Sequence, residues 1–265
     1  MINKKTKLFI SVSKFPGSTG SLLHNTGYKM KNLNCIYFPL KCEDTLEFKS
    51  IINNKNFKGI SVSMPFKNKA LKFLNQVDGI VKKTLSVNTI VRQNNILSGY
   101  NTDYLALKKI IKLKNIKAQN SLILGNGSTA RTTYELLKDL KIKQIYLCSR
   151  NKKNYKKWKI RKFDKIIDWN ERNNLKTKLF VNCTPLGMEN KNILPKRIFT
   201  KHDHQYIIDL TINNKNKLST IASKLRINYI SGLEISLYQG MEQFRIYTNQ
   251  MLSYKKIKKK LNYNF

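Results

Sequence analysis

Three short clusters of polar and charged side chains each follow an apolar run that predicts a strand. They carry Ser63 and Lys67, then Asn88, then Asp103. In open α/β sheets such strand ends form the edge where ligands bind. Where negative charge develops on an oxygen during a reaction, a nearby ammonium can stabilise that charge and deliver a proton, and a carboxylate can hold the ammonium in place. Lys67 and Asp103 are therefore a candidate catalytic pair, although the residues alone favour the alternative, a structural ion pair between loops.

A glycine-rich segment, Gly125-Asn126-Gly127-Ser128-Thr129-Ala130, follows an apolar strand and opens a helix. In such a turn Gly125 makes the tight bend, Gly127 removes a Cβ where the backbone meets a pyrophosphate, and Ala130 lets helix and strand pack closely. The helix N-terminus offers N–H groups and a positive dipole end to the phosphates. The pattern predicts dinucleotide binding, with an ordinary strand-to-helix turn as the alternative.

The next predicted strand ends in Ser149-Arg150-Asn151, where an NAD site usually has Asp or Glu for the ribose 2′-hydroxyl. A guanidinium at this position suits the 2′-phosphate of NADP instead. Lys152 and Lys153 follow and add to the same preference. The predicted cofactor is therefore NADP(H), unless Arg150 merely faces solvent.

Strand and helix patterns alternate through the first hundred residues, which indicates βαβ units. Strands are expected over residues 7–12, 34–38 and 57–63, and helices over 21–30 and 45–53. Asn94-Asn95, between the apolar runs 89–92 and 96–100, predicts a hairpin that makes the sheet mixed. Thr102 can then cap a helix that runs to about residue 113.

The alternation restarts at Leu122. It predicts a helix to about residue 140, a strand over 144–148, a basic helix, strands over 179–183 and 206–210, and a helix over 218–225. The Pro-free segment 233–261 has apolar residues at helical spacing. We expect an α/β protein with a mixed-sheet, substrate-binding catalytic domain over 1–101 and a Rossmann-type NADP-binding domain over 102–235. Residues 236–265 are expected to form a C-terminal helix that packs back on the N-terminal domain.

The chain of 265 residues has 51 Lys and Arg against 15 Asp and Glu, a net charge of +36. Its 41% hydrophobic content excludes a disordered polyelectrolyte. The lysines are spread along the chain with Asn and Ile, which share A/T-rich codons, so drift in base composition explains them without a ligand. Nucleic acid is therefore not expected as a partner. The alternative is polyanion binding by the basic runs 152–162 and 255–260, which otherwise form a solvated helix face or tail.

Membrane and metal partners are not expected. No apolar stretch reaches the ~18–20 residues of a spanning helix. The four cysteines lack the CxxC spacing of a metal site: Cys35, Cys42, Cys148 and Cys183. We interpret them as reduced packing residues of a cytoplasmic protein. The expected partner is a small-molecule substrate, and the expected assembly is a monomer or a homodimer.

The clusters occur in the same order in the shikimate dehydrogenases, a family that the chain resembles over nearly its whole length. Further matching segments are His24-Asn25, Ser149-Arg150, Asn182 to Met188, Ile230 to Glu234 and Tyr238-Gln239-Gly240. The resemblance implies reversible hydride transfer between NADPH and the C3 carbonyl of 3-dehydroshikimate, a step towards chorismate and the aromatic amino acids. It gives the proton handling to Lys67 and Asp103.

The same resemblance implies a substrate pocket and a cofactor crevice. The pocket residues are Ser18, Gly20, Ser63, Lys67, Asn88, Asp103 and Gln239, and Leu210 and Gly232 line the crevice near the nicotinamide.

The chain departs from the family pattern at three pocket positions. Gly20 replaces the second of two serines that hold the substrate carboxylate, Ser63 replaces a threonine, and Ile212 stands where a tyrosine is common. Some relatives that act on quinate also alter these hydroxyls. The alternatives are therefore a quinate/shikimate dehydrogenase of broader specificity, or a catalytically inactive basic relative that binds nucleic acid or a protein partner.

Overall fold

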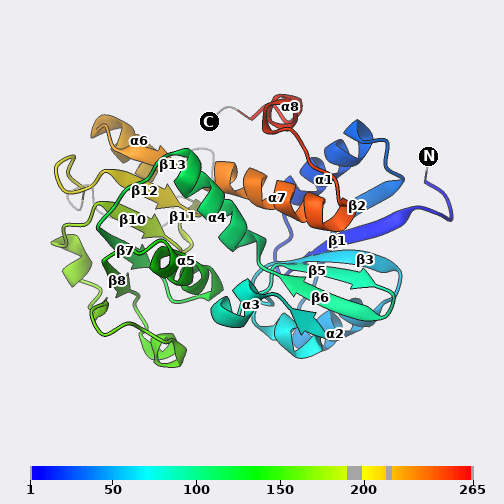
Figure 1. The fold of residues 1–265 in the computed structure, drawn as a ribbon, viewed down its shortest axis with the longest axis horizontal. Helices are drawn as coiled ribbons and strands as arrows, with labels where there is room; N and C mark the ends of the chain where they lie inside the picture. Colours follow the sequence, from blue (N-terminus) through cyan, green and yellow to red (C-terminus); the bar gives the residue numbers. More distant parts are fainter. Residues whose placement is uncertain (1, 190–198, 213–216, 264–265) are drawn as a thin grey trace. The chain divides into compact units, whose positions relative to one another are not determined.

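The computed structural model describes residues 2–189, 199–212 and 217–263 (Figure 1). The chain divides into two compact units. Unit 1 contains Met1–Ala106 and Leu237–Phe265, and unit 2 contains Leu107–Ser236.

Unit 1 is built on a six-stranded mixed sheet in the order β2-β1-β3-β5-β6-β4. The strands are β1 (Lys7–Ser13), β2 (Cys35–Lys41), β3 (Phe57–Val62), β4 (Gln76–Val77), β5 (Thr89–Gln93) and β6 (Ile96–Tyr100). β1 pairs in parallel with β2 and β3, whereas β5 runs antiparallel to β3 and β6. The hairpin turn has Asn94 at a φ of 55°, a left-handed conformation that asparagine tolerates. The prediction of a mixed sheet is confirmed.

Helices cover both faces of this sheet, because alternate side chains of a strand point to opposite faces. Ile10 packs with Phe48 of α2 (Thr45–Asn53) in one apolar cluster, which also includes residues of α3 (Gly79–Thr84) and of the 3₁₀ turn η1 (Lys69–Phe73). Phe9 packs in a second cluster with residues of α1 (Thr19–Met30), α7 (Gly232–Thr248) and α8 (Tyr254–Lys260). A Cβ on Gly27 of α1 would lie 2.7 Å from the Phe244 ring, so glycine permits the close approach of α1 and α7.

The C-terminal segment corrects one expectation. The expected single C-terminal helix over 236–265 is wrong, because α7 ends at Thr248 and α8 starts only at Tyr254. Asn249 has a φ of 55°, which terminates the first helix. The bend lets Leu252, Ile257 and Leu261 join the cluster that contains Phe9.

The start of α4 (Thr102–Leu113) corrects a second expectation. The Asn101 side chain, not Thr102, accepts a hydrogen bond from the Tyr104 N–H at 3.1 Å, as an N-cap does. Thr102 is thereby the first helical residue, and its hydroxyl is directed to other partners.

Unit 2 has an all-parallel, six-stranded sheet in the order β13-β12-β10-β7-β8-β9. Its strands are β7 (Asn120–Leu124), β8 (Gln144–Cys148), β9 (Lys165–Ile167), β10 (Leu179–Asn182), β12 (Tyr206–Asp209) and β13 (Asn228–Ile230); β11 (Leu186–Glu189) lies outside this sheet. Unit 2 also contains the helices α5 (Ser128–Asp139) and α6 (Lys217–Lys224). From β7 the chain builds outward to β8 and β9 and then returns to place β10 on the other side, so a switch point lies between β7 and β10. This is the Rossmann-type order that was predicted.

The expected basic helix after β8 is wrong. Residues 153–157 form only a 3₁₀ turn, η2 (Lys153–Lys157), and η3 (Glu171–Asn173) is a second such turn before β10. Tyr155 is 2% exposed, its ring contacts Trp158 edge-on, and Trp158 contacts Tyr134 of α5. This aromatic packing replaces the regular helix that the lysine-rich sequence favours locally.

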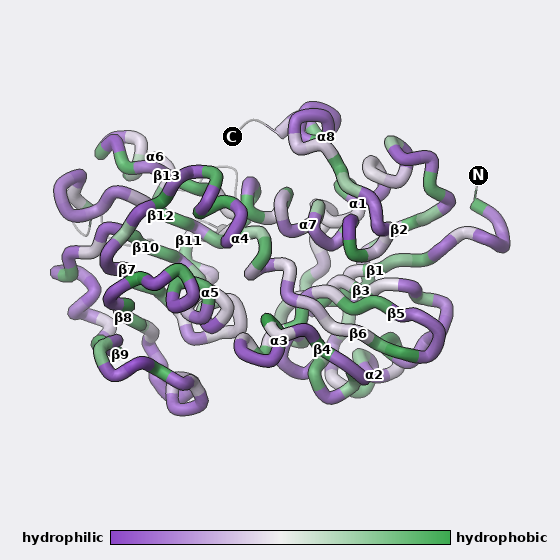
Figure 2. The backbone as a smooth tube through the Cα atoms, viewed as in Figure 1, coloured by the Kyte–Doolittle hydropathy of each residue, from purple (hydrophilic) through white to green (hydrophobic). Residues whose placement is uncertain are grey.

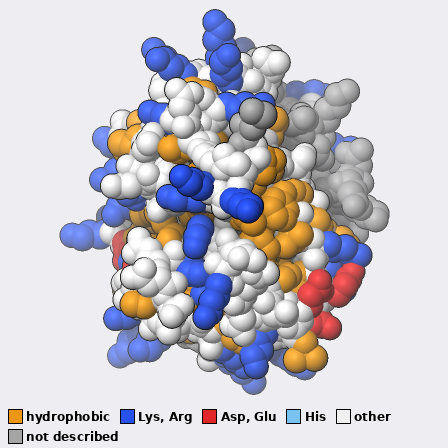
Figure 3. All heavy atoms as spheres, turned by 90° about the vertical axis from the view of Figure 1, so that its right-hand side faces the viewer, with side chains coloured by type: hydrophobic (Ala, Val, Ile, Leu, Met, Phe, Trp, Pro, Cys, Tyr) orange, Lys and Arg blue, Asp and Glu red, His pale blue; other side chains and the backbone are white. Residues whose placement is uncertain are grey.

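Hydropathy and charge follow the expected distribution. Figure 2 shows hydrophobic segments along the strands and hydrophilic segments in most connections. Figure 3 shows lysine and arginine spread over the visible face, with acidic side chains at only a few points. Within the described part of the chain, no helix is sufficiently long and apolar to cross a membrane.

Candidate functional site

Lys67 and Asp103 meet in unit 1. The Lys67 Nζ donates to Asp103 Oδ2 at 2.5 Å, and the two side chains are only 12% and 17% exposed. Lys67 follows β3, where Phe66 is fully buried and stacks on Phe48 at 4.7 Å. Asp103 lies in the first turn of α4, where the helix dipole favours a carboxylate. Two separate elements thus deliver the charged pair that the sequence analysis placed together.

Asn88 fixes the second carboxylate oxygen. Its Nδ2 donates to Asp103 Oδ1 at 2.8 Å, and its Oδ1 accepts from the Thr102 N–H at 2.8 Å. A backbone N–H can only donate, so the amide orientation of Asn88 is determined and its NH₂ must face Asp103. Both oxygens of the carboxylate therefore have a donor.

The hydroxyl of Thr102 connects Gln239 to this group. Gln239 Nε2 donates to Thr102 Oγ1 at 3.0 Å, and Thr102 Oγ1 donates to Asn88 Oδ1 at 3.0 Å. Gln239 is partly exposed on α7, which leaves part of its amide accessible to a ligand.

The loops that carry Ser18 and Ser63 leave the same sheet edge, because β1 and β3 are parallel neighbours. Both serines are exposed. Ser18 makes no side-chain cap at the start of α1. At Gly20 a Cβ would lie 3.3 Å from the Tyr37 hydroxyl oxygen, so the tyrosine borders the space that a serine side chain would use.

The glycine loop in unit 2 has the geometry of a phosphate turn. Gly125 has a φ of 114°, and a Cβ there would lie 2.9 Å from the Cys183 carbonyl oxygen, so only glycine fits. Gly127, the N-cap of α5, has open space around its missing Cβ. Ala130 is fully buried where α5 packs. The other loop residues, Asn126, Ser128 and Thr129, are partly buried.

Arg150 follows β8 and is exposed, beside the glycine loop. Asn151 joins the two segments, because its carbonyl oxygen accepts from the Asn126 side-chain amide and from Ser149 Oγ. Tyr155 OH also donates to the Gly125 carbonyl at 2.9 Å. The structure therefore brings the segment Ser149-Arg150-Asn151 to the glycine loop.

The ends of β10 and β12 form a second polar cluster in unit 2. Asn182 Nδ2 donates to Asp209 Oδ1 at 3.0 Å, and Tyr229 OH donates to Asp209 Oδ2 at 3.2 Å. Burial raises the pKa of Asp209. Leu210 follows directly, and Gly232 is required because a Cβ there would lie 2.2 Å from the Thr211 carbonyl oxygen. Leu210 and Gly232 are thus brought together, and Ile212 is 48% exposed.

The residues behind the charged pair were not predicted from the sequence. Thr89, Thr102 and Gln243 hold Asn88, and Asp209 anchors the loop after β12. Thr102 and Thr89 stand next to predicted site residues, which is the signal that could have found them. Gln243 carries no such signal, because it lies within a helix whose buried face depends on distant residues.

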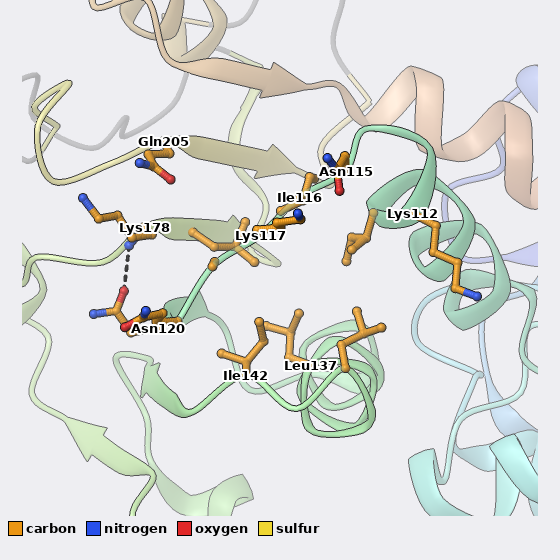
Figure 4. A pocket seen from close by; sticks show the side chains of 14 residues that line it. Lys112, Asn115, Ile116, Lys117, Asn120, Leu137, Ile142, Lys178 and Gln205 are labelled. Atoms are coloured by element: carbon orange, nitrogen blue, oxygen red, sulfur yellow. Dashed lines mark hydrogen bonds between the residues drawn. The ribbon is translucent and has the colours of Figure 1, made fainter.

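A groove of about 800 Å³ lies elsewhere in unit 2 (Figure 4). It lies at the ends of β7 and β10 remote from the glycine loop, over Leu137, Ile142 and Ile116. Its lysines do not converge, since Lys112 points away and Lys178 Nζ donates to the His202 carbonyl. None of the predicted site residues lines it.

A Rossmann-type unit with a phosphate loop, joined to a mixed-sheet unit with a lysine–carboxylate pair, defines a dinucleotide-dependent oxidoreductase of two units. A family profile described as shikimate dehydrogenase substrate binding domain matches residues 14–90. A Clostridium botulinum protein named shikimate dehydrogenase (NADP(+)) is 33% identical over 225 residues, covering 82% of this chain and 87% of the relative. This chain belongs to the shikimate dehydrogenase family.

Two further matches extend over almost the whole chain. A Haemophilus influenzae protein named shikimate dehydrogenase-like protein is 28% identical over 255 residues, which cover 94% of this chain and 93% of the relative. The crystal structure of shikimate dehydrogenase from Aquifex aeolicus superposes with a TM-score of 0.86 at 25% identity, covering 99% of this chain and all of the other.

Proposed function

We propose that this protein is an NADP-dependent shikimate dehydrogenase, which reversibly reduces 3-dehydroshikimate to shikimate in aromatic amino acid biosynthesis. The observation that carries the proposal is the 2.5 Å contact between Lys67 and Asp103, with Asn88 on the second carboxylate oxygen, in a chain of this family.

Lys67 handles the proton in the proposed reaction. As the ketone oxygen gains negative charge, the ammonium stabilises it and donates a proton from Nζ. Asp103 holds the ammonium in position and, with Asn88 and Gln239, offers hydrogen bonds to ring hydroxyls. In the reverse direction Lys67 Nζ takes up the hydroxyl proton.

The residues of unit 2 fit NADP(H), which supplies the hydride when bound. Gly125 and Gly127 leave no Cβ at the turn, and the N-terminus of α5 is proposed to bind the phosphates. Ser149, Arg150 and Asn151 are the proposed contacts of the 2′-phosphate and ribose, with Asn126, Ser128, Thr129 and Ala130 in the loop. Leu210 and Gly232 are proposed to line the nicotinamide region.

Ser18 and Ser63 are proposed to hold the substrate carboxylate. Gly20 lacks the second hydroxyl of the family pattern, so these loops of unit 1 have fewer donors for a charged group. In unit 2, Ile212 lacks the tyrosine hydroxyl that is common at its position. Each missing bond to a charged group is worth about 1.5–3 kcal/mol. This specific loss favours a second candidate, a quinate/shikimate dehydrogenase of broader specificity.

The test measures nicotinamide absorbance with 3-dehydroshikimate and NADPH, then with NADH. Turnover with NADPH and much weaker turnover with NADH is expected. Lys67→Ala purified in parallel controls for host enzyme. Oxidation of shikimate and quinate with NADP⁺ then distinguishes the two candidates. No turnover with either coenzyme would favour an inactive relative that binds a partner.

The cellular setting and assembly are also proposals. The four cysteines are free thiols, and burial raises the pKa of Cys148 to about 11 and that of Cys183 to about 12, which suits packing residues in a reducing cytoplasm. We propose a monomer or homodimer that does not use nucleic acid as a partner. Sedimentation and RNA binding at physiological salt test both points.

A further inference from the structure

We propose that Gln243 is a positioning residue for the Lys67–Asp103 pair, and that it acts through Thr89 and Asn88. The inference rests on the proposed function for its kinetic test, but its structural basis is independent. Gln243 lies on α7, four residues after Gln239, and is 4% exposed. The hydrogen bonds described for Gln243 reach neither Lys67 nor Asp103, so any influence must pass through other side chains.

Both ends of the Gln243 amide make hydrogen bonds to buried groups. Nε2 donates to the Asn88 carbonyl and to Thr89 Oγ1, both at 3.0 Å. Oε1 accepts from Ser61 Oγ at 3.1 Å and faces His24 Nε2 at 3.5 Å. The Asn88 carbonyl can only accept, so the amide orientation is fixed. Gln243 therefore joins α7 to the end of β3 and to the start of β5.

The contacts continue from Gln243 to the charged pair. Thr89 Oγ1 accepts from Gln243 and donates to Asn88 Oδ1 at 3.0 Å. Asn88 Nδ2 donates to Asp103 Oδ1, and Asp103 Oδ2 accepts from Lys67. Asn88 is thus held twice by Gln243, directly at its backbone carbonyl and through Thr89 at its side chain. Asn88 is 2% exposed and Thr89 is fully buried, so water cannot readily replace a lost bond.

This arrangement gives Gln243 a specific task. The carboxylate of Asp103 must stay in one place for Lys67 to present its proton to the substrate, and misplacement by about 1 Å can cost a factor of about 100 in rate. Asn88 is the side chain that fixes Asp103 Oδ1, and Gln243 prevents Asn88 and Thr89 from turning towards other partners. Gln243 contributes position rather than charge.

The experiment replaces Gln243 by an apolar side chain of nearly equal length. Gln243→Met keeps the volume and removes all hydrogen bonds. We expect kcat to fall about tenfold, equivalent to the loss of one typical hydrogen bond, while the KM for NADPH stays unchanged. Leu237→Met, on the same helix and fully buried without a role in these contacts, is the matched control for repacking and is expected to keep wild-type kcat.

A double-mutant cycle tests whether Gln243 acts through Thr89. Thr89→Val alone is expected to lower kcat by a similar factor, and the double variant by little more than either single one, because both changes break the same connection. A wild-type kcat for Gln243→Met, or effects that multiply to about a hundredfold in the double variant, would overturn the inference.

Crystal structures of the wild type and of Gln243→Met test the inference without turnover. The expected result is a displaced or doubled Asn88 side chain and a changed Asn88–Asp103 contact, with the backbone of α7 in place. Unchanged Asn88 and Asp103 positions would refute the positioning role. Lack of wild-type turnover would count against the proposed function alone, and these structures would still decide the role of Gln243.

Discussion

The polar groups of the two units differ in how firmly the surrounding protein holds them in position. Around Lys67 in unit 1, the functional atoms already bond to one another, and their supports Asn88 and Thr89 are buried. At the glycine loop of unit 2, Gly127 and Arg150 are exposed, and the loop is shaped mainly by backbone conformation. Proton transfer needs side chains held in advance, whereas a coenzyme that binds and leaves needs accessible groups on a rigid turn.

Removal of the ammonium should have the largest effect. Lys67→Ala is expected to lower kcat by at least about a thousandfold, because it removes both the proton donor and the charge opposite the developing oxyanion. Steady-state kinetics measures the rate, and fluorescence titration with NADPH should show nearly unchanged affinity. Near-normal turnover would contradict the mechanism.

The sequence predicted the parts of each unit that depend on local patterns. Apolar runs located β3 and β6, the strands before Lys67 and Asp103. The expectation that Asn88 also follows a strand is wrong, because Asn88 directly precedes β5. It still reaches the same edge of the sheet, since β5 runs antiparallel to both β3 and β6 and starts where they end. The glycine loop was equally readable, because the positive φ of Gly125 is a requirement of the backbone itself.

The parts that the sequence did not predict depend on distant contacts. Lysines favour a helix after β8, yet Tyr155 and Trp158 form an aromatic cluster with Tyr134 and leave only a 3₁₀ turn. Gln243 resembles any polar residue of a helix until the packing of α7 turns it towards Asn88.

A glycine pair can test how far backbone shape governs unit 2. Gly125→Ala should destabilise the fold by about 1–3 kcal/mol, because alanine is strained at a φ of 114° and its Cβ would meet the Cys183 carbonyl. Gly127→Ala is the matched control, since it has open space, and should keep stability while weakening NADPH binding. Urea unfolding and coenzyme titration measure the two effects. Equal stabilities of the two variants would contradict this account.

The stability of the folded protein should depend on pH through the buried histidine of unit 1, His24. Burial lowers the pKa of His24 from 6.5 to about 3, so the folded protein keeps this ring neutral while the unfolded chain takes up a proton. Stability from this group is complete above pH 6.5 and is lost as pH falls towards 3, by at most about 1.4 kcal/mol per pH unit.

Urea unfolding between pH 7 and 5 measures this slope, with His24→Gln as the comparison. Burial also lowers the pKa of His204 in unit 2, so the variant should keep part of the slope. An identical slope in both proteins would show that His24 does not titrate in this way.

A substitution of Arg150 tests whether this exposed side chain binds the coenzyme. Arg150→Ala should weaken NADPH about tenfold and NADH little, since only NADPH carries a 2′-phosphate. The stability should stay unchanged, because the side chain is exposed. Titration with both coenzymes measures the difference. An equal loss of affinity for NADPH and NADH would show that Arg150 does not bind the 2′-phosphate.

The smallest effect is expected from a substitution at Gly20 in unit 1. Gly20→Ser adds the hydroxyl that the family pattern has at this position, and the Tyr37 ring needs to yield only a few tenths of an ångström, because the new Cβ would lie 3.3 Å from its oxygen. The KM for shikimate should fall about threefold to tenfold, with kcat unchanged, because the hydroxyl binds the carboxylate and not the reacting carbonyl. Gly17→Ser, which has open space and no predicted contact, is the control. A fall in kcat instead would mean that Tyr37 and its buried neighbours already use this space to hold the site in position.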